Sequence, residues 1–172
     1  KAEHAAAIDK AVFPGMQGGP IMSAIAAKAV ALHECQQSSY QSYAKQVVVN
    51  AKALASALVS EGMRAISGGT ETHLALIDVT GVGVTGKVAD ERCGASGITL
   101  NKNSIPFDPN PPAVTSGIRV GTPAVTTQGM GVDQMHVIAN LITRAIKSDD
   151  AKEHAKIKSE VQSLVTKYPI YA

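Results

Sequence analysis

The chain has 172 residues, of which 45% are apolar, and its 16 basic and 14 acidic residues leave a formal net charge of +2. This balance excludes the strongly basic surface that binds nucleic acid or anionic membranes, and 3% of aromatic residues is too few for base-stacking platforms. No apolar run is long enough to span a bilayer. We therefore expect a cytoplasmic globular protein with one core domain, or one domain with an appendage.

The two cysteines, Cys35 and Cys93, lie far apart and lack the C-x-x-C or Cys/His spacing of a structural zinc site. His33 precedes Cys35 by two positions on a predicted helix, where the two side chains point to different faces. We interpret His33 and Cys35 as packing residues and predict no metal site. Such sparing use of cysteine is typical of proteins in a reducing cytosol.

The segment FPGMQGGP, residues 13–20, contains two prolines and three glycines, which disfavours a helix and a central strand. Gly18 and Gly19 allow positive φ and leave their backbone N–H groups bare, and Pro20 suits the start of a helix. N–H groups at a helix start can bind an anion, but the same sequence is also an ordinary helix entry. The segment alone leaves both interpretations open.

Apolar residues at helical spacing run from Ile21 to Leu32, resume after Ser38–Ser39, and stop at Gly62. A pattern of roughly forty residues exceeds the usual globular helix. We predict a long or bent connecting helix, with a possible break near Ser38–Ser39.

Two short strands are predicted in MRAISGG and HLALIDVT, separated by a glycine turn at 68–69. A helix over 86–93 follows, capped by Thr85 and ended by Gly94 and Gly97. These local signals predict a β–β–α unit.

Three polar or charged residues in or next to the two strands are candidate catalytic residues. His73 precedes the second strand, and we interpret it as a satisfied core or edge histidine rather than a base. Glu71 and Asp78 are too separated in the pattern to form a carboxylate pair.

The segment ITLNKNSI, residues 98–105, predicts a strand that leaves Asn101, Lys102 and Asn103 at its end. PFDPNPP must be an irregular loop, because four of its seven residues are proline. Such stiffness suits a surface that holds its shape for a ligand.

The stretch VTSGIRVGTPAVTTQG contains one charged residue, Arg119, in what we predict to be a buried strand. A buried guanidinium costs several kcal/mol unless a carboxylate pairs with it. That carboxylate either belongs to the protein or arrives with a ligand, and the pattern alone does not decide between them.

Two amphipathic helices are predicted at the end of the chain, over 132–147 and 150–167. Their predicted inward residues are Met135, Ile138, Ile142, Ile146, Ile157, Val161 and Leu164. The order of the elements predicts an α/β fold, a layered α/β sandwich preceded by a long connecting helix.

Four segments, AVFPGMQGGP, SGGTETHLALIDVTG, GITLNKNSIPFDP and VTSGIRVGTPAVTTQG, resemble serine hydroxymethyltransferases in order and spacing, as does the ending KYPIYA. The resemblance covers almost all of the chain. It implies a fold-type I, aspartate-aminotransferase-like enzyme that uses pyridoxal 5'-phosphate (PLP). Such an enzyme transfers a one-carbon unit between serine and tetrahydrofolate, as a cytoplasmic homodimer or homotetramer in amino-acid biosynthesis.

The resemblance also implies a division of the chain and roles for individual residues. Residues 1–35 would be the tail of the PLP-binding large domain, with the glycine loop and the start of the connecting helix, and 36–172 the small C-terminal domain. Arg119 matches the arginine that binds the substrate carboxylate. Gly19, with Gly18 beside it, matches the glycine whose N–H reaches the cofactor phosphate of the neighbouring subunit. The positions matching the folate site are Phe13, Asn103, Pro111, Pro112 and Ala113. Ala113 stands where the family usually has an aromatic or larger residue.

The family's Schiff-base lysine follows a run of threonines and a histidine, and none of Lys1, Lys10 or Lys28 has that context. We expect it upstream of Lys1, together with the aspartate and histidine that contact the cofactor ring and the catalytic glutamate. We therefore expect no catalytic residue in this chain and no activity from it alone. Arg119 and Gly19 could still serve in trans beside a complementary N-terminal piece.

Two other classes of protein remain open: a binding or assembly module that keeps the fold without catalysis, and another PLP enzyme such as an aminotransferase. An evolved module would present a polar surface where the large domain packs. Ile21, Met22 and Ile25 do not form such a face, which favours a fragment with an association-prone surface. The pairing of QGGP with the folate-like loop argues against an aminotransferase.

Overall fold

The computed structural model describes residues 1–170 and divides the chain into two compact units, Lys1–Gln41 and Ser42–Ala172. The last two residues of the ending KYPIYA lie outside the described residues. None of the helices among residues 1–170 is long and apolar enough to span a membrane.

The first unit consists of short helical segments in which every side chain is exposed. Its elements are η1 (Ala2–His4), α1 (Ala5–Lys10), η2 (Ala11–Met16) and α2 (Met22–Cys35). Phe13 and Pro14 have non-helical backbone angles inside η2, so the predicted irregular turn is present there. The break in the connecting helix falls at Gln36–Gln37, directly before α3 (Ser38–Ser60) begins, as predicted.

Two predictions for the first unit are wrong in detail. Helix α2 has Ile21 as its N-cap, so Pro20 precedes the helix instead of opening it. His33 and Cys35 are exposed rather than packed, because this unit has no core in which to bury them.

The second unit contains an antiparallel sheet of four strands in the order β1-β2-β4-β3. The strands are β1 (Arg64–Ala65), β2 (Leu74–Asp78), β3 (Asn101–Asn103) and β4 (Gly117–Gly121). Strand β3 is shorter than predicted, and the polar residues form the strand instead of lying at its end. Asn101 pairs with Arg119 and Asn103 pairs with Gly117 in register. An edge strand tolerates polar side chains because solvent meets one of its sides.

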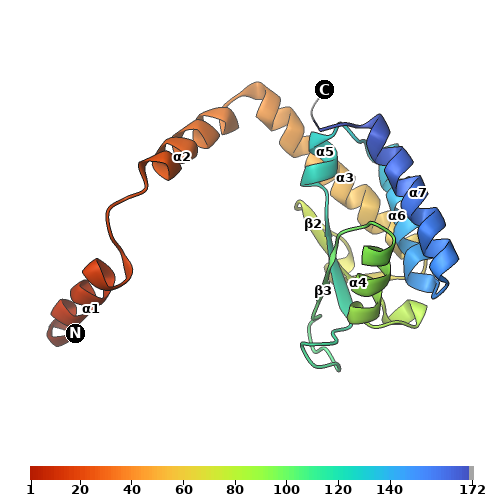
Figure 1. Cartoon of the computed structure of the whole chain (residues 1–172), viewed down its shortest axis with the longest axis horizontal. Helices are drawn as coiled ribbons and strands as arrows, with labels where there is room; N and C mark the ends of the chain where they lie inside the picture. The colour runs from red at the N-terminus through yellow and green to blue at the C-terminus, as the bar shows by residue number, and fades with distance from the viewer. Residues whose placement is uncertain (171–172) are drawn as a thin grey trace. The chain divides into compact units, whose positions relative to one another are not determined.

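The helices of this unit pack against one another and against the sheet (Figure 1). Besides α3 they are α4 (Gly86–Ala95), α5 (Pro123–Thr127), α6 (Val132–Lys147) and α7 (Ala151–Lys167). The Thr85 hydroxyl accepts a hydrogen bond from the Val88 N–H at 3.3 Å, which confirms the predicted cap of α4. Gly94 lies inside α4, whereas Gly97, with φ +76°, follows its end. Helices α6 and α7 have the predicted bounds, and Asp150 caps α7.

The core lies between one face of the sheet and the helices. Residues at alternate positions of the two central strands, Ala75, Ile77, Ile118 and Val120, are buried there. Cys93 on α4 is fully buried among them. The arrangement confirms the predicted α/β class. It also leaves the other face of β2 and β4 partly open to solvent.

Candidate functional site

Arg119 lies on β4, with its side chain on the open face of the sheet, and is exposed. Strand β4 is largely buried, as predicted, but the expected burial of Arg119 itself is wrong, because its neighbours Ile118 and Val120 face the core and side chains alternate along a strand. Its guanidinium therefore carries no burial cost. Among the described residues no carboxylate pairs with it, and its Nε donates to the Asn101 Oδ1 at 3.4 Å.

An open depression of about 550 Å³ surrounds this guanidinium. It is lined by His73, Leu74, Thr99, Leu100, Asn101, Arg119 and Gly121. The guanidinium offers the depression several N–H donors in one plane, the geometry that matches a carboxylate. The depression can therefore hold a small anionic ligand against β4.

His73 is exposed and directly precedes β2, an inner strand of the sheet, so it is neither a core histidine nor part of an edge strand. Its carbonyl oxygen accepts a hydrogen bond from the Thr122 N–H at 3.0 Å, which fixes its backbone beside Arg119. Glu71 and Asp78 have different partners, Lys52 at 4.0 Å and Arg64 at 2.7 Å. The prediction that they are not a carboxylate pair is confirmed.

The loop between β3 and β4 is closed at its base, where Asn103 pairs with Gly117. Asp108 holds the loop from inside: its carboxylate accepts hydrogen bonds from the N–H groups of Ile105, Asn110 and Ser116 and from the Ser116 hydroxyl. Desolvation raises the pKa of Asp108, but these hydrogen bonds outweigh it and lower the pKa to about 2. The proline-rich loop is thus irregular, as predicted, and pinned by one carboxylate.

Two glycines allow close approaches at the end of this loop, Gly117 to Ile105 and Asn103, and Gly86 between the loop and α4. A Cβ at Gly117 would lie 2.7 Å from Ile105 Cγ2 and 2.9 Å from the Asn103 carbonyl oxygen. A Cβ at Gly86 would overlap the Thr115 hydroxyl and the Gly117 carbonyl. The approach at Gly86 lets the first N–H groups of α4 donate to loop carbonyls, Gly86 to Thr115 at 3.0 Å among them.

The residues predicted from the family resemblance fall in both units. Asn103 is half-buried in β3, and its side-chain amide donates to the Ser104 carbonyl at 2.7 Å. Pro111, Pro112 and Ala113 are exposed on the pinned loop, so this loop connects all four positions. Phe13, 64% exposed, belongs to the first unit with Gly18 and Gly19.

The glycine loop is the candidate contact for a cofactor phosphate. A Cβ added at Gly18 or Gly19 would meet no atom within 4 Å, so the space beside both residues is open. That space leaves room for a phosphate group.

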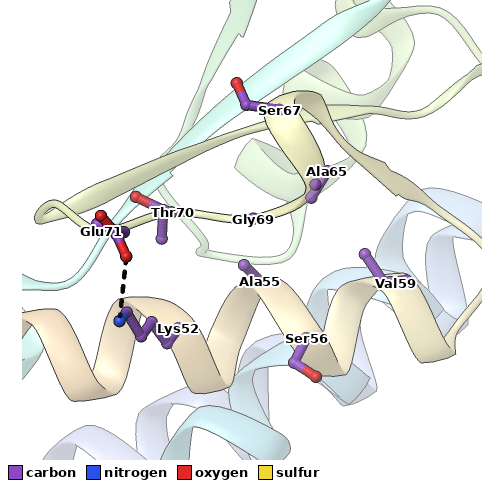
Figure 2. Close-up of a pocket in the computed structure, with 10 residues that line it drawn as sticks. Lys52, Ala55, Ser56, Val59, Ala65, Ser67, Gly69, Thr70 and Glu71 are labelled. Carbon is purple, nitrogen blue, oxygen red and sulfur yellow. Dashed lines mark ion pairs between the residues drawn. The ribbon is translucent and has the colours of Figure 1, made fainter.

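A second depression, of about 520 Å³, lies between α3 and the turn that follows β1 (Figure 2). Lys52 and Glu71 form an ion pair at one end, and both side chains are largely exposed. Figure 2 shows the hydroxyls of Ser56 and Ser67 directed away from the space between the helix and the turn. Its polar groups are therefore paired or turned outward, and we assign it no chemistry.

An α/β domain with an exposed arginine in an open depression, next to a pinned loop, has the features of a domain that binds small anionic ligands. The model of the serine hydroxymethyltransferase family matches residues 1–142, and the chain belongs to this family. A curated serine hydroxymethyltransferase of Coprothermobacter proteolyticus is 51% identical over 171 residues, which are 99% of this chain. The chain spans 41% of the length of that relative.

The role of Asp108 in organising the loop was not predicted from the sequence. The motif D-P-N, with an aspartate two residues before an asparagine, was the available signal, because aspartate side chains often accept from the N–H two residues on. Its bonds to Ser116 join residues eight positions apart, and no local pattern indicates them.

Proposed function

We propose that this chain is part of a PLP-dependent serine/glycine hydroxymethyltransferase of the aspartate-aminotransferase-like fold. In this proposal residues 1–35 end the large domain and 36–172 form the small C-terminal domain of a cytoplasmic homodimer or homotetramer. The observation that carries it is the exposed guanidinium of Arg119 in an open depression without a carboxylate partner among the described residues, in a chain of this family.

Arg119 binds the carboxylate of serine or glycine in this proposal. A charge-assisted hydrogen bond contributes about 1.5–3 kcal/mol, and a guanidinium can donate two in parallel to one carboxylate. The Asn101 amide oxygen lies on the Nε side of the guanidinium, at 3.4 Å, and helps to orient it. Arg119 thereby holds the carboxylate of the amino acid against the sheet, and the reacting carbon of the amino acid points away from the sheet.

In this proposal the backbone N–H groups of Gly18 and Gly19 donate to the cofactor phosphate of a neighbouring subunit. PLP, when bound, supplies an electron sink for chemistry at the amino-acid α-carbon. The residues that hold its ring, including the lysine, are proposed to lie outside this chain, so the chain alone is inactive. Tetrahydrofolate, the second substrate, contacts the pinned loop at Asn103 and 111–113. Phe13 of the first unit is proposed separately as a folate contact.

The alternative is a binding or assembly module without catalysis. That role requires a solvated surface on residues 1–41, whereas Ile21, Met22 and Ile25 are apolar and 71%, 67% and 47% exposed. Apolar exposure of this kind favours a segment that packs against the rest of an enzyme.

The test is complementation between this chain and the missing part of the family's length. The chain is co-expressed with the N-terminal portion of the Coprothermobacter relative, and the conversion of serine and tetrahydrofolate to glycine is measured. We expect activity only in the combination. Arg119→Lys should lower kcat/KM for serine about tenfold or more, mainly through KM, because lysine loses the paired donors.

Arg64→Lys is the matched control, since Arg64 is an exposed arginine of the same sheet that pairs with Asp78. It should leave the KM for serine unchanged. Turnover by the chain alone, or an unchanged KM in Arg119→Lys, would contradict the proposal.

A further inference from the structure

A cavity of about 190 Å³ lies within the second unit, behind the sheet strand that carries Arg119. Its walls come from α6 and α7 on one side and from β4 and the segment 97–100 on the other. The side chains that line it include Leu54, Ile98, Leu100, Val120, Val125, Met130, Ile138, Leu141, Ile142, Val161, Leu164 and Val165.

The lining contains no charged side chain, and its only polar side chains are those of Thr99 and Gln128. The Gln128 amide already donates to the Tyr168 carbonyl at 3.0 Å. Among residues 1–170 no buried side-chain nitrogen or oxygen lacks a hydrogen bond. The cavity therefore offers a ligand apolar contact and almost no polar partner.

The size of the cavity defines its occupant. An apolar cavity of about 150 Å³, lined by similar side chains, stays dry and takes up benzene. This cavity has slightly more room, about 190 Å³, enough for one small ring or a short branched hydrocarbon group. Ile98, Leu100, Val161 and Leu164 are partly exposed at its margin, so a ligand can enter without unfolding of the core.

We propose that this cavity is a binding site for a small apolar molecule the size of a single six-membered ring. The site goes beyond the proposed function, because none of the residues assigned to serine, PLP or tetrahydrofolate lines it. Burial of the ring against aliphatic side chains provides the affinity. Ionic ligands are not expected to bind, because the lining has no charged side chain to pair with them.

The position of the cavity gives the site a connection to Arg119. Thr99, Leu100 and Gly121 line both the cavity and the Arg119 depression. Asn101, which accepts from Arg119, follows Leu100 directly. A ligand in the cavity therefore contacts the segment that positions the guanidinium. Binding of the ligand should perturb the environment of Asn101.

The test is a titration of the whole chain with benzene, followed through the methyl NMR signals of isoleucine, leucine and valine. We expect saturable shifts at Ile138, Val161 and Leu164, with half-saturation in the millimolar range or below. Ile77 is buried in the core but does not line the cavity, and its signal should stay in place.

The variant Val161→Phe fills the cavity and should weaken benzene binding about tenfold or more, because the added ring occupies the same space. Val49→Phe adds the same group at a position 47% exposed on α3, outside the cavity, and should bind like the parent. If Val161→Phe does not fold, pressurised xenon on the parent chain replaces it, with the same methyl signals as the readout. Shifts that grow linearly and equally at all methyls, or unchanged affinity in a folded Val161→Phe, would overturn the proposal.

Discussion

Replacing Asn50 with alanine removes a buried polar junction between α3 and the segment around α5. Asn50 is fully buried, and its side-chain amide donates to the Thr126 hydroxyl and to the Met130 carbonyl, both at 2.9 Å. Its oxygen accepts from the Gln46 amide at 2.8 Å. No other side chain described here joins these segments with two buried donors.

The expected loss of stability follows from these contacts. Two buried hydrogen bonds contribute about 1 kcal/mol each, and a buried acceptor left without its donor costs about 1–3 kcal/mol more. Gln46 is half-exposed and can turn to water, so its bond adds little. We expect Asn50→Ala to lower the free energy of unfolding by about 3–5 kcal/mol, which corresponds to a Tm lower by about 6–20 °C.

Urea and thermal unfolding, followed by far-ultraviolet circular dichroism, measure this loss. Asn140→Ala is the control, because Asn140 is exposed on α6, and it should change stability by less than about 0.5 kcal/mol. Asn50→Asp keeps the volume but removes both donors at neutral pH, so it should be at least as unstable as Asn50→Ala. A loss below about 1 kcal/mol in either Asn50 variant would refute the reasoning from buried hydrogen bonds.

Three further predictions concern the reactivity of the two cysteines, the dependence of stability on pH, and the space around Gly117. Cys35 is exposed and should react at once with a thiol reagent, whereas burial and then Asp90 raise the pKa of Cys93 to about 12, so Cys93 should react only on unfolding. The pKa of Asp108 is about 2 in the folded chain, against about 3.9 unfolded, so its stabilisation is present above pH 4 and lost as the pH falls toward 2. Acid titration of Asp108→Asn should show a smaller loss over that window, and an identical curve would contradict this assignment. Gly117→Ala should destabilise the chain by about 2 kcal/mol or more in urea, because backbone atoms occupy the space for its Cβ. A urea midpoint of Gly117→Ala equal to that of the parent chain would contradict this prediction and show that the loop can move to make room for the methyl group.

The elements with strong local signals were predictable from the sequence. Helices α6 and α7 combine a long apolar stripe with recognisable ends, and Thr85 is a standard N-cap residue. Helix α5 was missed because it is short, although Pro123 at its start is a helix-entry signal.

The environment of the candidate site was less predictable. The buried strand of Arg119 was identified, but the exposure of the Arg119 side chain was not, since a run of small and apolar residues does not show which face the helices cover. The alternation of Ile118 and Val120 with Arg119 was the usable signal. The apolar cavity depends on how side chains from six segments pack together, and no spacing in the sequence expresses such an arrangement.

Three features of the structure act on the same junction, the start of β4. Asp108 holds the loop end at Ser116, Gly117 permits the close approach of Ile105, and Gly86 places the first N–H groups of α4 on the loop carbonyls. Arg119 is two residues further along this strand. Its backbone is therefore fixed by contacts that leave its side chain exposed, and such preorganisation reduces the entropy lost when a ligand binds. Substitutions at the junction should accordingly weaken ligand binding at Arg119 without touching the ligand, in proportion to how far they free the start of β4.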